Sequence, residues 1–207
     1  MNQILIQTWL EKNNIQLPDY AYAKLELYQR LVLEKNEHLN LTGITDSDEF
    51  AVKHFIDSLS PVPLIKDAKT VCDAGTGAGF PGIVLAVALP EINFTLIDAR
   101  AKRILFLESV VKVLELKNVR CIHTRSEDLK EKFDVVTARA VAPMDKLVKF
   151  TLSLLNPTGR LIAMKSLAYK KELESAEPFI SKLGRKVIEI REVKISDEII
   201  RNIIIVG

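Results

Sequence analysis

A glycine-rich segment, Lys69 to Gly82, holds the residues of this chain that are best suited to binding chemistry. It reads Lys-Thr-Val-Cys-Asp-Ala-Gly-Thr-Gly-Ala-Gly-Phe-Pro-Gly, and an apolar stretch, Ile83 to Leu89, follows it. This order predicts a strand that ends at Asp73, then a tight turn and the start of a helix. Because glycines have no side chains, a nucleotide-like cofactor could lie against the main-chain N–H groups and the helix N-terminus.

Two classes of cofactor compete for this loop. Gly77 to Gly82 fits G-x-G-x-x-G, the pattern of dinucleotide-binding proteins. The longer pattern D-x-G-x-G-x-G, which begins at Asp73, resembles the loop of class I S-adenosylmethionine (SAM) methyltransferases. SAM has an ammonium group that an acid near the loop could hold, whereas the same acid would repel a dinucleotide pyrophosphate.

A second acid, Asp98, ends the β-rich run Asn93 to Asp98. A carboxylate at the end of the second strand can accept hydrogen bonds from both hydroxyls of a ribose, which NAD and SAM each contain. The alternative interpretation is that Asp98 caps the following helix.

The end of the expected fourth strand reads Thr137-Ala-Arg-Ala-Val-Ala-Pro143. It lacks the Asn/Asp-Pro-Pro-aromatic motif of enzymes that methylate exocyclic amines, and it lacks a cysteine nucleophile. It offers Arg139, beside which we expect no carboxylate base. Such a site suits an acceptor with a free lone pair, for example guanine N7, which needs no general base, so that catalysis would be the alignment of donor and acceptor. Alternatively, Arg139 forms a structural salt bridge.

Further basic residues are expected at the same edge of the sheet: Lys53, His54, Arg125, Lys165 and Arg201. Each one alone fits a solvated surface charge, whereas together they could hold the phosphates of an RNA backbone. His54 fits equally well a helix-face residue that pairs with Asp57.

The elements that must position these residues follow from the apolar pattern. Three helices are expected in the first 60 residues, near 4–10, 19–37 and 48–59, with Asp46 or Ser47 as the cap of the third and Pro61 and Pro63 at its end. From Lys69 onward, strands and helices alternate. The expected strands are 69–73, 93–98, 119–123, 133–138, 160–164, 186–192 and 202–206, and the expected helices are 80–89, 100–117, 144–155 and 169–183.

Repeated βα units predict an α/β fold with a mostly parallel, seven-stranded sheet and helices on both faces. The short connection between the last two strands predicts an antiparallel last strand, which favours a class I methyltransferase, Rossmann-like sheet over a plain dinucleotide-binding one. We therefore expect a helical extension over residues 1–62, packed on a SAM-binding core over residues 63–207.

Composition limits the remaining possibilities. The net charge of +2 does not decide whether the protein binds nucleic acid, so any basic surface that does so must be local. The three histidines and two cysteines show no metal-binding spacing, and Cys72 and Cys121 fall in expected strands as reduced residues, so we expect no metal and a cytoplasmic location. The N-terminus lacks the pattern of a signal peptide, and no apolar run reaches the roughly 20 residues that span a bilayer.

Four blocks of the chain together resemble the bacterial 16S rRNA guanine-N7 methyltransferase family, RsmG or GidB. They are Asn40 to Thr45, Lys53 to Ser58, Asp73 to Gly82 and Arg139 to Ala142. The resemblance implies methyl transfer from SAM to N7 of a guanine in the 530-loop region of small-subunit rRNA. It implies cofactor contacts from Asp73, Gly75, Thr76, Gly77, Gly79, Phe80, Asp98, Ser126, Glu127 and Arg139. It also implies a basic RNA-binding pocket from Asn40, His54, Arg125, Arg139, Lys165 and Arg201, at whose edge Lys53 also lies.

Two other functions remain open at this point. One is an NAD(P)-dependent small-molecule enzyme or redox sensor, and the other is a SAM-binding ribosome assembly factor without catalysis. Two roles are open for the N-terminal helices, which are to bind RNA or to cover the sheet. We expect a monomer whose partner is 16S rRNA or the small ribosomal subunit, with no membrane association.

Overall fold

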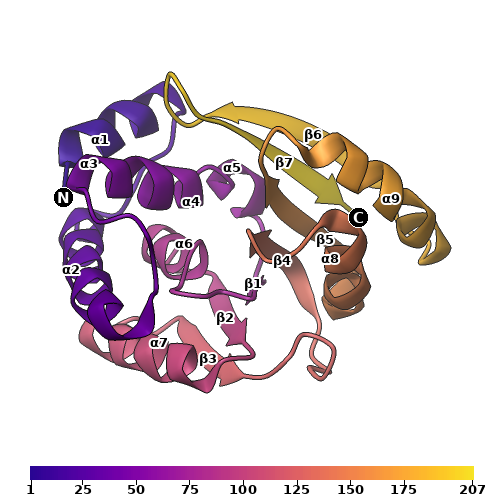
Figure 1. The fold of residues 1–207 in the computed structure, drawn as a ribbon, viewed down its shortest axis with the longest axis horizontal. Helices are drawn as coiled ribbons and strands as arrows, with labels where there is room; N and C mark the ends of the chain where they lie inside the picture. The colour runs from indigo at the N-terminus through magenta and orange to yellow at the C-terminus, as the bar shows by residue number, and fades with distance from the viewer.

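The computed structural model describes residues 1–207 and contains one seven-stranded sheet in the order β3-β2-β1-β4-β5-β7-β6 (Figure 1). The strands are β1 Thr70–Ala74, β2 Asn93–Asp98, β3 Val119–His123, β4 Phe133–Arg139, β5 Leu155–Lys165, β6 Val187–Lys194 and β7 Ile200–Val206. β1 to β5 pair in parallel, whereas β7 runs antiparallel to both β5 and β6. The predicted mostly parallel sheet with an antiparallel last strand is confirmed.

Helices cover both faces of the sheet, as predicted. The helices are α1 Gln3–Lys12, α2 Ala21–Leu39, α3 Ser47–Phe50, α4 Asp57–Leu59, α5 Val62–Ile65, α6 Gly82–Ala88, α7 Ala101–Val113, α8 Met144–Thr151 and α9 Tyr169–Lys182. α8 and α9 lie on the opposite side of the sheet from α2, α6 and α7 (Figure 1). The two faces bury separate apolar clusters, because side chains of a strand alternate between the faces.

The N-terminal helices share the larger apolar cluster with the sheet. Ile6 of α1, Leu25 of α2 and Phe55 belong to one cluster of 38 buried residues that also contains Val71 of β1 and Leu85 of α6. Helices of residues 1–62 therefore cover the sheet, which is one of the two roles left open for them. The domain boundary at residue 62 stays a prediction. No helix is both long and apolar enough to span a membrane.

The third expected helix is correct in extent but not in geometry. Asp46 caps it by accepting hydrogen bonds from the N–H groups of Asp48 and Glu49. Its centre, Ala51–Ile56, is π-helical and continues directly into α4. Such wide turns are rare and often occur at functional sites. The predicted end of this helix is confirmed, because α4 ends at Leu59, before Pro61. Proline is tolerated in a first helical turn, and Pro63 lies in that of a further short helix, α5.

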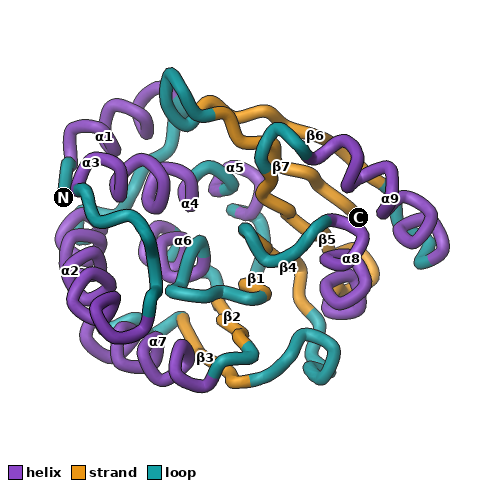
Figure 2. Tube along the Cα trace, in the orientation of Figure 1, coloured by secondary structure: helices purple, strands orange, loops and turns teal.

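Several other boundaries differ from the prediction, and the largest differences concern α7, α8 and β5. α7 ends at Val113 rather than at residue 117. α8 ends at Thr151 and a short 3-10 turn, Leu152–Leu154, follows it, so the expected helix over 144–155 is too long. β5 begins at Leu155 rather than at residue 160, and it therefore includes Pro157 and Gly159, which read as a turn. The connection from β3 to β4 is a loop without a helix, which Figure 2 shows in teal, as the sequence predicted.

Candidate active site

The glycine loop leaves β1 at the carboxyl edge of the sheet and enters α6. Gly75, Gly77 and Gly79 have φ values of 69°, 63° and 102°, which side-chain-bearing residues rarely adopt. The N–H of Thr76 donates to the carbonyl of Ile97 at 3.0 Å, which joins the loop to the neighbouring strand β2. The three glycines therefore allow a tight turn that main-chain bonds hold against the sheet.

Asp73 lies beneath this loop and not in a cavity. It is 1% exposed, its Oδ2 accepts from the N–H of Gly82 at 2.9 Å and its Oδ1 accepts from the hydroxyl of Thr137 at 3.0 Å. Burial raises the pKa of Asp73, whereas these hydrogen bonds act in the opposite direction. In the structure both oxygens bind the protein itself and hold the start of α6, and the contact of this acid with a cofactor ammonium stays a prediction.

Gly79 is required by packing. A Cβ atom at this position would lie 2.5 Å from the hydroxyl of Tyr28 and 2.8 Å from both Ile83 and Leu107. The Tyr28 hydroxyl donates to the carbonyl of Ala78 at 2.6 Å, and burial raises the pKa of this tyrosine. Gly79 thus lets α2 approach the loop. It was a predicted cofactor contact, but it lines neither of the two cavities described below.

Asp98 joins the loop to the helix that follows β2. Its Oδ2 accepts from the N–H of Gly77 at 3.0 Å and from Arg103 Nη1 at 3.1 Å, and its Oδ1 accepts from the N–H of Arg100 at 2.8 Å. The side chain is 6% exposed and borders a cavity of about 210 Å³. Asp98 therefore both stabilises the start of α7 and lies where a ribose contact was expected.

The smaller cavity also collects the predicted Ser126–Glu127 turn. Its lining includes Gly75, Ile97, Asp98, Ser126 and Glu127, together with the predicted RNA contact Arg125. Ile97 supplies an apolar wall, and Ser126 is buried while Glu127 is exposed. An apolar wall with hydrogen-bonding groups at both ends suits a nucleoside.

A larger cavity of about 810 Å³ adjoins the smaller one, because Gly75 and Val141 line both. Thr76, Gly77 and Phe80 also line it. A Cβ on Gly77 would meet nothing closer than 3.8 Å, so the space above this main chain is open. The two connected cavities fit a cofactor with a nucleoside at one end and a charged chain at the other, lying across the glycine loop.

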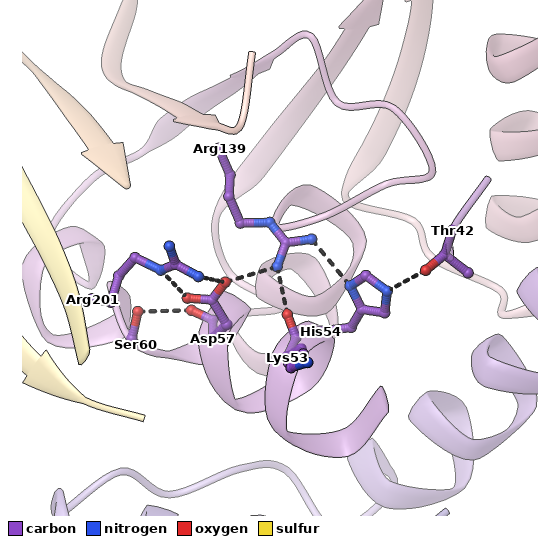
Figure 3. Close-up of polar contacts among 7 residues, drawn as sticks. All are labelled: Thr42, Lys53, His54, Asp57, Ser60, Arg139 and Arg201. Atoms are coloured by element: carbon purple, nitrogen blue, oxygen red, sulfur yellow. Dashed lines mark hydrogen bonds and ion pairs between the residues drawn. The ribbon is translucent and has the colours of Figure 1, made fainter. Parts of the chain in front are cut away.

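Asp57, which lines the larger cavity, is a buried carboxylate bound by two arginines (Figure 3). Asp57 is 1% exposed, and its Oδ2 accepts from Arg139 Nη1 at 3.0 Å. Arg201 donates to the same carboxylate twice, from Nε at 2.7 Å and from Nη2 at 2.8 Å. The prediction that no carboxylate lies beside Arg139 is therefore wrong, and the salt-bridge alternative describes its contacts.

The π-helical turn helps to bring Arg139 to this position. In a regular α-helix the N–H of Asp57 would donate to the carbonyl of Lys53, four residues earlier. Here it donates instead to the carbonyls of Val52, five residues earlier, and His54. The Lys53 carbonyl instead accepts from Arg139 Nη1 at 2.9 Å (Figure 3). The Lys53 side chain pairs with Glu49 on the surface.

His54 is held between Arg139 and Thr42. Arg139 Nη2 lies 3.3 Å from His54 Nδ1, and His54 Nε2 lies 2.7 Å from the Thr42 hydroxyl. A guanidinium can only donate, so Nδ1 accepts and the proton is on Nε2. Burial, Arg139 and Lys53 lower the pKa of His54 to about 3, so the ring is neutral. The expected alternative pairing of His54 with Asp57 is wrong, since both Asp57 oxygens bind arginines.

Aromatic rings pack beneath these polar contacts. The ring of Phe80 stacks on that of His54, with centroids 4.3 Å apart and planes 8° apart, and the Arg139 guanidinium carbon lies 5.3 Å from the Phe80 centroid. Phe50 packs edge-on against both rings. This packing restricts the rotation of His54 and Arg139.

The other predicted RNA contacts are only partly brought together. Lys165 lines the larger cavity but donates to the Ala142 carbonyl at 2.5 Å and to Glu172 at 2.8 Å. Asn40 lines neither cavity: it is exposed and ends α2 in a left-handed conformation. A further cavity of about 820 Å³, between α1 and the β6–β7 hairpin, contains none of the predicted residues.

Asp57 and Thr42 are site residues for which the sequence predicted no role in binding or catalysis. A buried carboxylate in an otherwise apolar helix requires a cationic partner, so the apolar neighbours Phe55, Ile56 and Leu59 were a usable signal. Thr42 lies within the Asn40 to Thr45 block, of which only Asn40 was predicted to contact RNA. Nothing in the local sequence indicates the hydrogen bond between Thr42 and His54.

The sheet order and the glycine loop define the fold of class I SAM-dependent methyltransferases. Solved structures of this fold superpose well: TYW2 of M. jannaschii in complex with AdoMet has a TM-score of 0.61 and 20% identity, covering 81% of this chain and 78% of that one. Magnesium protoporphyrin IX methyltransferase (ChlM) of Synechocystis PCC 6803 with bound SAM has a TM-score of 0.62 and 17% identity, covering 86% and 96%.

The family is shown by sequence. The chain belongs to the GidB family, described as rRNA small subunit methyltransferase G, whose model matches residues 21–203. Ribosomal RNA small subunit methyltransferase G of Lactobacillus helveticus is 40% identical over 194 residues, 89% of this chain and 81% of that protein. The protein of the same name from Clostridium botulinum strain Eklund 17B is 42% identical over 201 residues, 93% and 84%. The chain is thus a SAM-dependent methyltransferase, and the NAD(P) alternative is wrong.

Proposed function

We propose that this enzyme transfers a methyl group from SAM to N7 of a guanine in the 530-loop region of 16S rRNA. The names of its relatives support RNA of the small ribosomal subunit as the substrate class. The proposal places the protein in the cytoplasm, acting as a monomer, with naked rRNA or the small subunit as its partner.

One observation carries the choice of acceptor atom: the larger cavity offers no free general base. Its two carboxylates are Asp57, which binds two arginines, and Glu172, which binds Lys165. Its histidine, His54, is neutral but has both ring nitrogens engaged. An acceptor that must lose a proton would find no partner there, whereas guanine N7 carries no proton.

The bound SAM supplies an electrophilic methyl group, which passes from sulfur to N7 together with the positive charge. The protein then has two tasks, which are to hold the nucleoside end of the cofactor and to align the base. Asp98, Ser126 and Glu127 are placed for the first task, because they border the smaller cavity. Arg139 is placed for the second, since its contacts with Asp57, His54 and Phe80 fix its position at the larger cavity.

RNA contact is proposed for the basic residues around the two cavities. Arg125 is exposed and has no acidic partner, so it is the best placed of them to bind a phosphate. Lys53, Lys165 and Arg201 already pair with acids of the protein and would add less counterion release. Asn40, which lines neither cavity, is proposed to contact RNA on the outer surface.

The test is nucleoside mass spectrometry on small ribosomal subunits from cells that lack the gene. Incubation with the purified protein and labelled SAM should produce one labelled 7-methylguanosine per 16S rRNA. A label on another base or another guanine atom would refute the proposed acceptor. Binding of SAM and subunits without any methyl transfer would instead support the non-catalytic assembly factor.

A further inference from the structure

The carboxylate of SAM has no partner among the residues assigned so far. SAM ends in an amino-acid chain that carries a carboxylate, and this chain falls in the larger cavity when the nucleoside occupies the smaller one. A carboxylate that leaves water requires a cationic partner or several N–H donors. The lysines and arginines that line the larger cavity are therefore the candidates for this role, namely Lys53, Arg103, Arg139, Lys165 and Arg201.

Arg103 is the least engaged of these five cations. Arg139 and Arg201 each use two guanidinium nitrogens on the protein, and the two lysines pair with glutamates and have no fork. Arg103 uses one nitrogen, because Nη1 donates to Asp98 Oδ2 at 3.1 Å while Nε and Nη2 form no hydrogen bond with the protein. Its side chain is 28% exposed. The pair Nε and Nη2 is thus a complete fork, which can bind a carboxylate through two parallel bonds.

Asp98 fixes this arginine beside the glycine loop. Its Oδ2 accepts from Arg103 and also from the N–H of Gly77 at 3.0 Å, so that one oxygen joins the guanidinium to the loop. Arg103 Nη1 lies 3.8 Å from the position that a Cβ atom of Gly77 would take. Arg103 and Gly77 line the larger cavity, whereas Asp98 lines the smaller one. Arg103 therefore lies at the loop between the expected ribose contact and the cavity that would hold the amino-acid chain.

We propose that Arg103 binds the carboxylate of SAM through Nε and Nη2. Asp98, the proposed ribose contact, also positions this arginine by accepting from Nη1. The inference concerns the cofactor, so it does not depend on which atom of the RNA is methylated. An RNA phosphate offers similar anionic oxygens, but the contact between Arg103 and the glycine loop favours the cofactor.

The experiment combines one side-chain change with one ligand change. Calorimetry measures the binding of S-adenosylhomocysteine, the demethylated product, and of S-adenosyl-3-thiopropylamine, which is the same molecule without its carboxylate. The proteins are the wild type, Arg103→Gln and Arg103→Lys, which keeps the charge but not the fork. Arg100→Gln is the matched control, because Arg100 precedes α7, is exposed and lines neither cavity. Circular dichroism checks that each variant is folded, and binding to small subunits is measured in parallel.

The wild type should bind S-adenosylhomocysteine about 10- to 100-fold more tightly than the ligand without the carboxylate, as one charged contact predicts. Arg103→Gln should weaken S-adenosylhomocysteine by a similar factor and the other ligand by less than threefold. Arg103→Lys should fall between the wild type and Arg103→Gln, and it decides the question alone if Arg103→Gln does not fold. Arg100→Gln should keep the wild-type preference.

Two results would overturn the inference. Equal weakening of both ligands by the Arg103 variants would show that Arg103 supports the loop or Asp98 and does not touch the carboxylate. Unchanged affinity for S-adenosylhomocysteine together with weaker binding to small subunits would assign the arginine to an RNA phosphate instead. Neither result would bear on the acceptor atom, which the labelling of 16S rRNA tests separately.

Discussion

Acidification should destabilise the protein through His54, by an amount that follows from its contacts. Burial and two neighbouring cations, Arg139 and Lys53, lower its pKa to about 3, against an ordinary value of 6.5 in the unfolded chain. Between these values the unfolded state binds one more proton than the folded state, so stability falls as pH falls. Above pH 6.5 the contribution of neutral His54 to the free energy of unfolding is fully present. At pH 5, which is 1.5 units below 6.5, the free energy of unfolding should be about 2 kcal/mol lower.

The assay is urea unfolding followed by circular dichroism at pH 8 and pH 5, for the wild type, His54→Gln and the exposed control His38→Gln. The wild type and His38→Gln should lose stability equally, whereas His54→Gln should lose about 2 kcal/mol less between the two pH values. Comparison between variants removes the contribution of all other titrating groups. A difference below about 0.5 kcal/mol would show that His54 is accessible to protons in the folded state, which would refute the network described here.

Three substitutions test other parts of the site. Asp57→Asn should cost about 3 to 5 kcal/mol in urea unfolding, because it leaves two half-buried arginines without their buried anion, while the exposed Asp48→Asn should cost under about 0.5 kcal/mol. Equal effects of the two substitutions would contradict the pairing of Asp57 with both arginines. Asp98→Ala should weaken SAM binding by about 1.5 to 3 kcal/mol in calorimetry, and unchanged affinity would remove Asp98 from the ribose site. Gly79→Ala should lower the unfolding free energy by about 3 kcal/mol, because its Cβ would overlap the Tyr28 hydroxyl, and wild-type stability would argue against that packing.

The parts of the fold that could be predicted are those that depend on local pattern. β2 and β3 begin and end at the predicted residues, because apolar runs bounded by polar residues identify buried strands. The glycine loop was recognisable because positive φ angles require glycine. The antiparallel β7 followed from the short connection that precedes it.

The errors concern contacts between residues far apart in the chain. Asp57 meets Arg139 and Arg201, which lie 82 and 144 positions later, and no local pattern indicates which acid will neutralise which arginine. The cofactor role of Asp73 stays a prediction, but its burial could not be predicted from its position at a strand end, because that burial depends on α6 folding back over it. The π-helical turn could not be predicted from the sequence, because its apolar residues fit an α-helix equally well.

The most direct test of the central claim, that methyl transfer here needs no general base, is the pH dependence of a single turnover. Preformed complex of enzyme and small subunit would be mixed with saturating SAM, and the rate of 7-methylguanosine formation measured from pH 6 to pH 8. The account predicts a rate that changes by less than twofold, because neither His54 nor Asp57 has to accept a proton. A rate that rises about tenfold per pH unit would show that a base must be deprotonated, and would contradict it.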